Sequence, residues 1–530
     1  MSLCFSRYLS RFSDEELDEK IKNLNDTCLS QNFVFQSSRS KKDRSLKLMT
    51  EILYKSSSAQ LQAREPNNLI ECAIKILLKY SNTPLHFEHE PVIPEKKRNS
   101  RYLLAKKNYY KLLKVFFNKE QEEIVEKIID VLHSEKLWQG RRVCIDIIIG
   151  LLDCGYKGSM ICNKIFNKIE ATDSSNEDCM KLIIKVLYEF LDSYKWPDNQ
   201  ETVLVLERLL HFYYKSSHDA SQDSKNRVYA NLRGGLELCV RHMIPNISNN
   251  HLLVIIQYMS SWSVSKHVSD NVILNYGSTL EYAAYMHQTQ SFVNTLSADV
   301  LPLIMQMIGS HVKFVSLLGN RVLQHLIDRG GNQMLFNSPK IFFENMQLNL
   351  KLRKYNKEDR KFLKQHREVI HDSLIKSVIY HRGCRLNLET TYCTICLLAI
   401  EVPCGFTAAA LCCIMMHLQE IIMKRPKKFG REASFHIHAI IISVLSFVCW
   451  IHEAKDFHNY VNKIVMERAQ WAPHLNPPLQ SRYNFAVHHV LWDKPELFLI
   501  DWEVRFGLWK RFRLNESSKH KTKRVYYEDS

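Results

Sequence analysis

The sequence predicts an all-α fold, a superhelical stack of helices (an irregular α-solenoid) with an aromatic-rich C-terminal cap. The chain holds only 15 Gly and 14 Pro in 530 residues, about half of the usual combined share of roughly 12%. Sheets, tight hairpins and phosphate-binding loops all use glycine, so its scarcity favours helices joined by short connections. Helical apolar periods also recur from residue 14 to about residue 465. Several segments are apolar nearly all round, as the inner helices of a stack would be.

Start signals mark individual helices along the chain. Three capping boxes place a small polar residue three positions before Glu or Gln. They are Ser13 with Glu16, Asn118 with Gln121, and Asp198 with Glu201. Prolines at the first helical position predict further starts at Pro302 and Pro339. Residues 1–13 carry Arg7, Arg11 and no acid, as a mitochondrial presequence does, but the Ser13 box favours a helix beginning at Asp14.

One unit shows the rhythm of a repeat. Within residues 311–331 (HVKFVSLLGNRVLQHLIDRGG) apolar side chains keep a helical period until Gly330 and Gly331 end it. This unit resembles the second helix of an armadillo or HEAT repeat, so the predicted stack is armadillo/HEAT-like. The resemblance implies architecture only, because no self-similar period runs along the chain.

The chain is expected to have four parts. A flexible N-terminus (1–13) precedes a helical repeat array (14–465) with a sub-boundary near 215–226. An aromatic- and proline-rich cap (466–514) concentrates four of the eight tryptophans and four of the 14 prolines. A basic disordered tail (515–530) ends the sequence.

One apolar segment leaves two interpretations open. Residues 433–451 carry no formal charge and are just long enough to span a membrane. Residues 402–416 are a second candidate, which Glu401 and Pro403 cut short. An inner helix of a solenoid is equally apolar, so the sequence also fits a buried helix.

No residue set assembles into a catalytic, metal or cofactor site. Cys393 and Cys396 form a C-x-x-C inside an apolar run of the Cys/His-rich region 384–452, without a second pair at zinc-finger spacing. The two histidines of HFEHE (86–90) could bind a metal ion, but an exposed loop is the commoner case for such a segment. In GLLDCGYKGS (150–159) the lysine of a phosphate loop is one position late. We therefore predict no catalytic residue, no metal ligand, no cofactor and no enzymatic activity.

Charge is the strongest physical signal. The formal net charge is +16, and residues 95–119 contain nine Lys or Arg against one Glu. Lys107, Lys111 and Lys114 fall on one face of a predicted helix. Residues 351–368, with eight basic and three acidic residues, form a second basic region. The predicted partner-binding residues are Lys96, Lys97, Arg98, Arg101, Lys107, Lys111 and Lys114.

These features predict a non-enzymatic scaffold or adaptor that binds protein partners with acidic segments through an extended basic surface. Two alternatives stay open: a chromatin- or RNA-associated protein that uses the same basic patches, and a peripheral platform on an anionic membrane. The 15 irregularly spaced cysteines are typical of reduced core thiols. With the basic runs Lys424–Lys428 and Lys519–Arg524, which resemble nuclear-import signals, they predict a location in the nucleus and/or cytoplasm.

Overall fold

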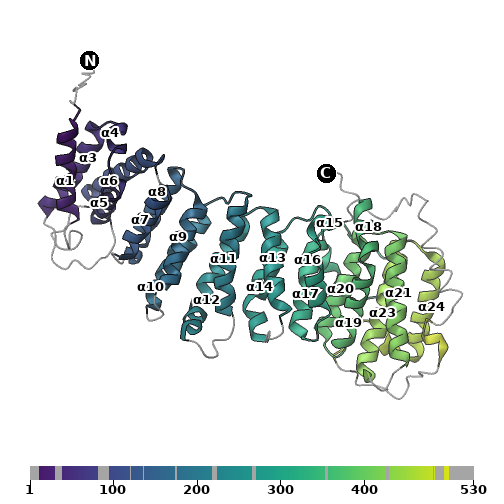
Figure 1. Cartoon of the computed structure of the whole chain (residues 1–530). Helices are drawn as coiled ribbons and strands as arrows, with labels where there is room; N and C mark the ends of the chain where they lie inside the picture. The colour runs from purple at the N-terminus through teal and green to yellow at the C-terminus, as the bar shows by residue number, and fades with distance from the viewer. Residues whose placement is uncertain are drawn as a thin grey trace. The chain divides into compact units, whose positions relative to one another are not determined.

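The computed structural model shows helices joined by short connections (Figure 1). It describes residues 11–29, 39–81, 95–119, 121–134, 137–172, 176–217, 224–265, 270–351, 356–424, 429–481, 483 and 494–499. No β-strand occurs within these ranges. The all-α, armadillo-like helical stack predicted from glycine scarcity and apolar periods is confirmed. The chain divides into two compact units, Met1–Ser248 and Asn249–Ser530.

The first unit is a two-layered stack. Its helices are α1 (Asp14–Cys28), α3 (Arg39–Lys55), α4 (Ser58–Gln62), α5 (Pro66–Tyr80), α6 (Glu95–Phe116), α7 (Gln121–Ser134), η1 (Leu137–Gln139), α8 (Arg141–Asp153), α9 (Gly158–Ala171), α10 (Glu177–Ser193), α11 (Gln200–Ser217), α12 (Ser224–Met243) and η2 (Ile244–Asn246). From α5 onward each helix packs against the second helix along the chain, so α5, α7, α9 and α11 form one layer and α6, α8, α10 and α12 the other. Each layer buries its apolar side against the other, as in a repeat array.

The second unit repeats this plan. Its helices are α13 (Asn249–Ser263), α14 (Asp270–Met286), α15 (Phe292–Thr295), α16 (Val300–Ile308), α17 (Lys313–Ile327), η3 (Gln333–Phe336), α18 (Lys357–Gln365), α19 (Arg367–Tyr380), α20 (Arg385–Glu401), α21 (Gly405–Lys424), α23 (Arg431–Ile451), α24 (Lys455–Trp471), η4 (Pro473–Leu475) and η6 (Pro495–Leu497). One row runs through α14, α17, α20 and α23, and the other through α13, α16, α19 and α21.

Two helix starts test the capping boxes that the sequence predicted. The Ser13–Glu16 capping box is present as predicted and begins α1 at Asp14. At α11 the prediction missed by one residue: the Asn199 side chain accepts a hydrogen bond from the Thr202 backbone N–H at 3.0 Å. Glu201, the expected partner of Asp198, instead bonds Lys157.

A non-helical segment replaces the helix predicted at Pro339. Residues 337–351 contain no helix and lie along α23. The Ser443 and Ser446 hydroxyls of α23 bond the backbone of Lys340 and Phe342. Polar side chains of a core helix thus satisfy the backbone of the extended chain, which therefore needs no helix of its own.

The described part of the predicted cap is held by one buried cation. Arg468 of α24 is completely buried and donates to the carbonyls of Leu497, Leu475 and His438 at 2.8, 3.0 and 3.2 Å. These carbonyls come from η6, η4 and α23, so a single side chain ties three segments together. Residues 500–514 of the cap, the tail 515–530 and residues 1–10 lie outside the described residues.

The predicted sub-boundary near 215–226 falls inside the first unit, where α11 is followed by α12. Residues 218–223 of this stretch are outside the described residues. The two compact units divide after Ser248, immediately before α13.

Candidate functional site

The first basic region forms α6, whose apolar side is buried. Ala105, Leu112, Leu113 and Phe116 are each at most 2% exposed. The helix packs against α3, α5 and α8. This packing fixes which of its basic side chains reach solvent.

Four of the predicted partner-binding residues are exposed: Lys96, Lys97, Lys107 and Lys114. Three of these, Lys96, Lys107 and Lys114, are separated by 11 and 7 residues, close to whole numbers of helical turns, so they form one line about 27 Å long. We call these three residues the α6 lysine row. Within the described ranges, the structure gives none of the three an ion pair. Leu103 falls on the same side and exposes 65% of its surface.

Two of the remaining predicted residues, Arg101 and Lys111, contact helix α3. Arg101 forms an ion pair with Asp43 of α3 at 2.7 Å. The Lys111 ammonium donates to the Leu53 carbonyl and lies 4.3 Å from the centre of the Tyr54 ring. Arg98 is half-buried. Arg101 and Lys111 therefore hold α6 against α3, and fewer of the predicted partner-binding residues are exposed than the sequence suggested.

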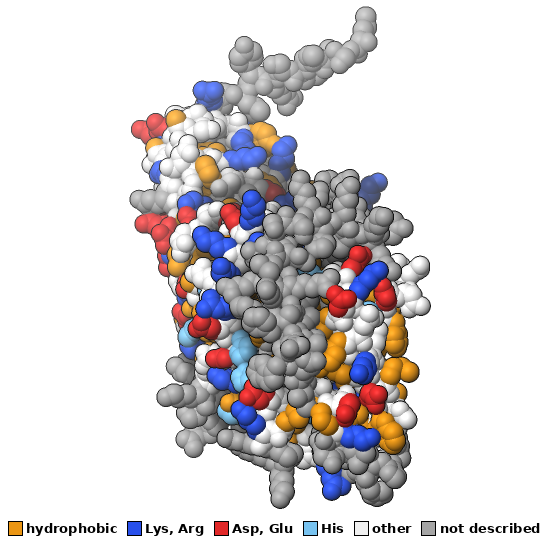
Figure 2. Space-filling model, turned by 90° about the vertical axis from the view of Figure 1, so that its right-hand side faces the viewer, with side chains coloured by type: hydrophobic (Ala, Val, Ile, Leu, Met, Phe, Trp, Pro, Cys, Tyr) orange, Lys and Arg blue, Asp and Glu red, His pale blue; other side chains and the backbone are white. Residues whose placement is uncertain are grey.

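The second basic region contains α18. Lys357, Lys361 and Lys364 are exposed at spacings of four and three residues, so they share one face of this helix. We call them the α18 lysine row. On the face shown in Figure 2, basic and acidic side chains are interspersed. A local row of lysines therefore indicates a binding site for an acidic partner better than the net charge of the chain does.

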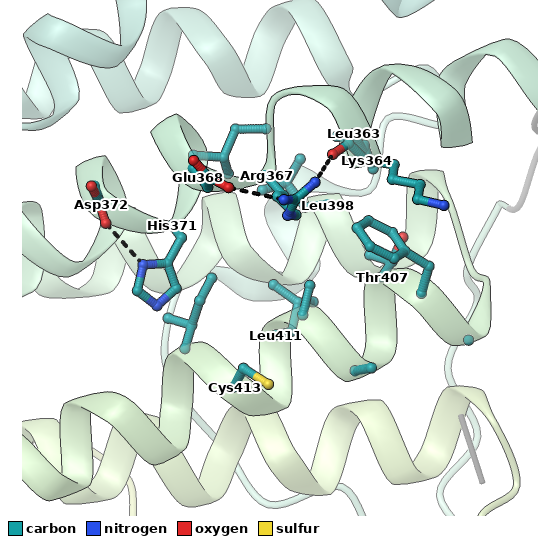
Figure 3. Close-up of a pocket in the computed structure, with 16 residues that line it drawn as sticks. Leu363, Lys364, Arg367, Glu368, His371, Asp372, Leu398, Thr407, Leu411 and Cys413 are labelled. Carbon is teal, nitrogen blue, oxygen red and sulfur yellow. Dashed lines mark hydrogen bonds and ion pairs between the residues drawn. The ribbon is translucent and has the colours of Figure 1, made fainter. Parts of the chain in front are cut away.

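The α18 lysine row ends at a groove of about 820 Å³ between α18–α19 and α21. Its floor is apolar, with Leu363, Leu398, Leu411 and Ile414 each at most 6% exposed. Figure 3 shows Lys364, Arg367 and His371 on one side of this space and Thr407, Leu411 and Cys413 on the other. The groove was missed at the level of sequence, because its two walls are separated by the length of α20.

The Cys/His-rich region supplies core thiols. Burial raises the pKa of Cys393 to about 12, and its Sγ lies 3.6 Å from the Gln333 carbonyl. Cys396 is completely buried, and burial raises the pKa of its thiol well above the ordinary value. Within the described ranges no group of three or more His, Cys, Asp or Glu could hold a metal ion. The HFEHE loop (86–90) lies outside those ranges.

Other candidates from the sequence are accounted for by packing. Lys157, in the segment that resembles a phosphate loop, forms an ion pair with Glu201 at 2.7 Å. Helices α21 and α23 are long and apolar enough to cross a membrane, but the apolar window of α23 is completely buried inside its unit. The apolar run 433–451 is therefore a buried core helix here.

One cluster of buried charges joins four elements of the second unit. Arg329 bonds Asp359 at 2.7 Å and Glu401 at 2.8 Å, with the three side chains only 6%, 0% and 4% exposed. Burial raises the pKa of Glu401 to about 7, although the Arg329 guanidinium opposes this shift. Burial alone would lower the pKa of Arg329, but its bonds to Glu401 and Asp359 raise it. The guanidinium also lies 4.7 Å from the Phe292 ring centre. Its bonds are all internal, so this cluster is structural.

The family was identified by comparison with known proteins. The family model described as EFR3, armadillo repeat, matches residues 14–488. The chain belongs to the EFR3 armadillo-repeat family. Protein EFR3 homolog A of Xenopus laevis is 22% identical over 180 residues, which cover 34% of this chain and 22% of the relative. The matched part is thus less than a quarter of that longer protein.

EFR3 membership supports a helical-repeat scaffold and corrects the predicted location. EFR3 proteins are scaffolds, which agrees with the prediction of a non-enzymatic protein. They are peripheral proteins anchored at the plasma membrane, so the predicted location in the nucleus and/or cytoplasm is wrong. Basic runs and reduced thiols misled the prediction, because both also occur in proteins on the inner surface of a membrane. The alternative role on chromatin depended on a nuclear protein and loses its support.

Proposed function

We propose that this protein is a non-enzymatic scaffold that assembles protein partners at the plasma membrane, with the α6 lysine row in contact with anionic lipid headgroups. The observation that carries the proposal is the row itself: three exposed lysines on one line, with no acidic partner within the described part of the chain. Each lysine near an anionic membrane surface contributes about 1 kcal/mol of binding. The row could therefore supply about 3 kcal/mol.

Leu103 favours lipid over other acidic partners. It lies between Lys96 and Lys107 on the same side of α6 and exposes 65% of its surface. A leucine flanked by lysines suits a membrane interface, where the apolar side chain enters the acyl boundary and the ammonium groups stay at the headgroups. The anchoring of EFR3 proteins at the plasma membrane supports this choice, because an anionic lipid surface is found there.

Vesicle flotation of the full chain tests this proposal. Vesicles that contain a third phosphatidylserine should carry the wild-type chain, and Lys96→Glu/Lys107→Glu/Lys114→Glu should weaken binding at least about 100-fold. The matched control Arg142→Glu/Lys185→Glu/Lys195→Glu changes the net charge equally at exposed positions elsewhere in the first unit. The control should retain most of the binding.

Acidic protein segments are the second candidate for the same row, as the charge alone suggested. A poly-glutamate peptide measured beside the vesicles separates the two. If the row variant loses the peptide but binds vesicles like the wild type, the lipid assignment is wrong and the row serves protein partners. If both variants bind vesicles equally, neither the row nor its geometry matters for membrane contact.

A further inference from the structure

The groove beside α21 is an apolar surface that no helix covers within the part of the chain that the structure describes. Helices α21 and α23 have similar mean hydropathies of 1.6 and 1.9 over their apolar windows, yet α23 is 100% buried there and α21 only 50%. Helix α21 packs mainly on α23 and makes smaller contacts with α20, α18 and α19. Among the described residues, one side of α21 therefore has no helix packed against it.

The shape of the open side suits a helix. The residues of α21 that line the groove include Gly405, Ala409, Ala410 and Cys413. Such short side chains let a second helix approach closely. The lining runs from residue 405 to residue 414, which is about 14 Å of helix and accommodates anchors at i, i+3 or i+4, and i+7.

Charge defines the flank of the groove. Lys364 lines it, and Lys361 and Lys357 continue the α18 lysine row for two turns beyond its end. Within the described residues none of these three lysines has an ion pair. Two carboxylates also line the groove: Glu368 bonds Arg367 at 2.9 Å, and Asp372 lies 3.1 Å from His371 Nδ1. The positive charge without an ion pair is therefore that of the α18 lysine row, at the α18 end of the groove. An apolar floor with one cationic flank complements an amphipathic helix with acidic residues on the matching side.

We propose that this groove docks an amphipathic helix of a protein partner, with apolar side chains on Leu398, Leu411 and Ile414 and acidic side chains against Lys361 and Lys364. The proposal deepens the scaffold role and rests on it, since it assigns a site and a chemistry to one partner. It uses the second unit alone and is independent of the α6 lysine row.

Two synthetic peptides serve as probes for the full chain. Each is a stapled helix of about 14 residues with leucine at i, i+3, i+4 and i+7. The acidic probe carries glutamate on one flank, and the basic probe carries lysine at the same positions. Fluorescence anisotropy should show binding of the acidic probe at least about tenfold tighter than binding of the basic probe, with an advantage that shrinks as salt increases.

Two variants locate the site. Ala410→Trp fills the groove and should weaken the acidic probe at least about tenfold. Lys361→Glu/Lys364→Glu should weaken the acidic probe about tenfold and strengthen the basic one. Lys455→Glu/Lys463→Glu on the exposed side of α24 is the matched control and should change neither. If Ala410→Trp lowers the unfolding temperature, Ala409→Glu is measured in its place. This variant should keep the fold and weaken binding of the acidic probe, because its carboxylate repels the glutamates of the probe.

The proposal is overturned if both probes bind equally, or if the groove variants bind the acidic probe like the wild type. It is also overturned if anionic vesicles, rather than the probe, respond to Ala410→Trp, because the groove would then be a lipid site. If the peptide experiment fails but the α6 lysine row still binds vesicles, the scaffold proposal remains supported. If the vesicle experiment fails but the acidic probe still binds, the proposal for the groove remains supported.

Discussion

Replacing Arg329 with methionine is expected to destabilise the second unit by about 3–5 kcal/mol near neutral pH. The guanidinium bonds Asp359 at 2.7 Å and Glu401 at 2.8 Å, and these carboxylates are only 0% and 4% exposed. Methionine fills similar space but carries no charge. Two carboxyl groups then remain in the interior without their cation, and the unfolded chain, which hydrates them, gains in relative stability.

An exposed ion pair gives the matched control. Lys157 and Glu201 approach to 2.7 Å, but 62% and 45% of their side chains are exposed. Lys157→Met should cost less than about 1 kcal/mol, because water screens this pair. Calorimetry of the full chain should show a transition lowered by on the order of 10 °C for Arg329→Met and by about 2 °C or less for Lys157→Met.

The cost should also depend on pH. Burial raises the pKa of Glu401 to about 7, so this carboxyl group takes up a proton in mildly acidic solution and no longer needs a cation. The shift caused by Arg329→Met should therefore be smaller at about pH 5.5 than at about pH 8. Equal shifts for Arg329→Met and Lys157→Met would refute the reasoning, because they would mean that burial of the cluster has no energetic consequence.

Three further outcomes follow from single contacts. In the wild type the folded-state pKa of Glu401, about 7, lies above its ordinary value of 4.5. The protonated Glu401 therefore stabilises the fold fully below pH 4.5, and this stabilisation is lost as the pH rises through about 7. Glu401→Gln should remove about 3 kcal/mol of this pH dependence, measured by urea unfolding between these two pH values. At Gly319 an added Cβ would lie 2.7 Å from the Met307 Cβ, so Gly319→Ala should destabilise the α16–α17 pair by about 1–3 kcal/mol, and an unchanged unfolding temperature would contradict this close packing. Asn199→Ala removes the cap on the Thr202 backbone N–H and should cost about 1 kcal/mol, with faster hydrogen exchange confined to the first turn of α11.

Local signals predicted most of the fold. Glycine scarcity and apolar periods were enough for the helical stack, and the Ser13–Glu16 box marked the first helix correctly. The lack of a polar side in residues 433–451 fitted either a buried helix or a membrane span, and only the structure shows that the apolar window of α23 is completely buried. The prediction failed where a tertiary contact overrides a local signal. Pro339 lies in extended chain because the hydroxyls of two serines in α23 satisfy the backbone there.

The candidate site was predictable only in part. Charge density identified α6, and exposure of Lys96, Lys107 and Lys114 agrees with a helical face. The sequence could not show that the Lys111 ammonium donates to the Leu53 carbonyl, because this hydrogen bond joins two helices that are far apart in the chain. The groove beside α21 could not be predicted from the sequence for the same reason. Its lining residues come from α18–α19 and from α21, which α20 separates along the chain.

The measurement that tests the central claim most directly is the salt dependence of vesicle binding by the full chain and by Lys96→Glu/Lys107→Glu/Lys114→Glu. The wild type should bind phosphatidylserine vesicles tightly at low salt and lose affinity as ionic strength rises past about 0.1 M. The triple variant should bind weakly throughout, with a much flatter response. Identical curves for the two chains would contradict the assignment of the α6 lysine row to the membrane surface.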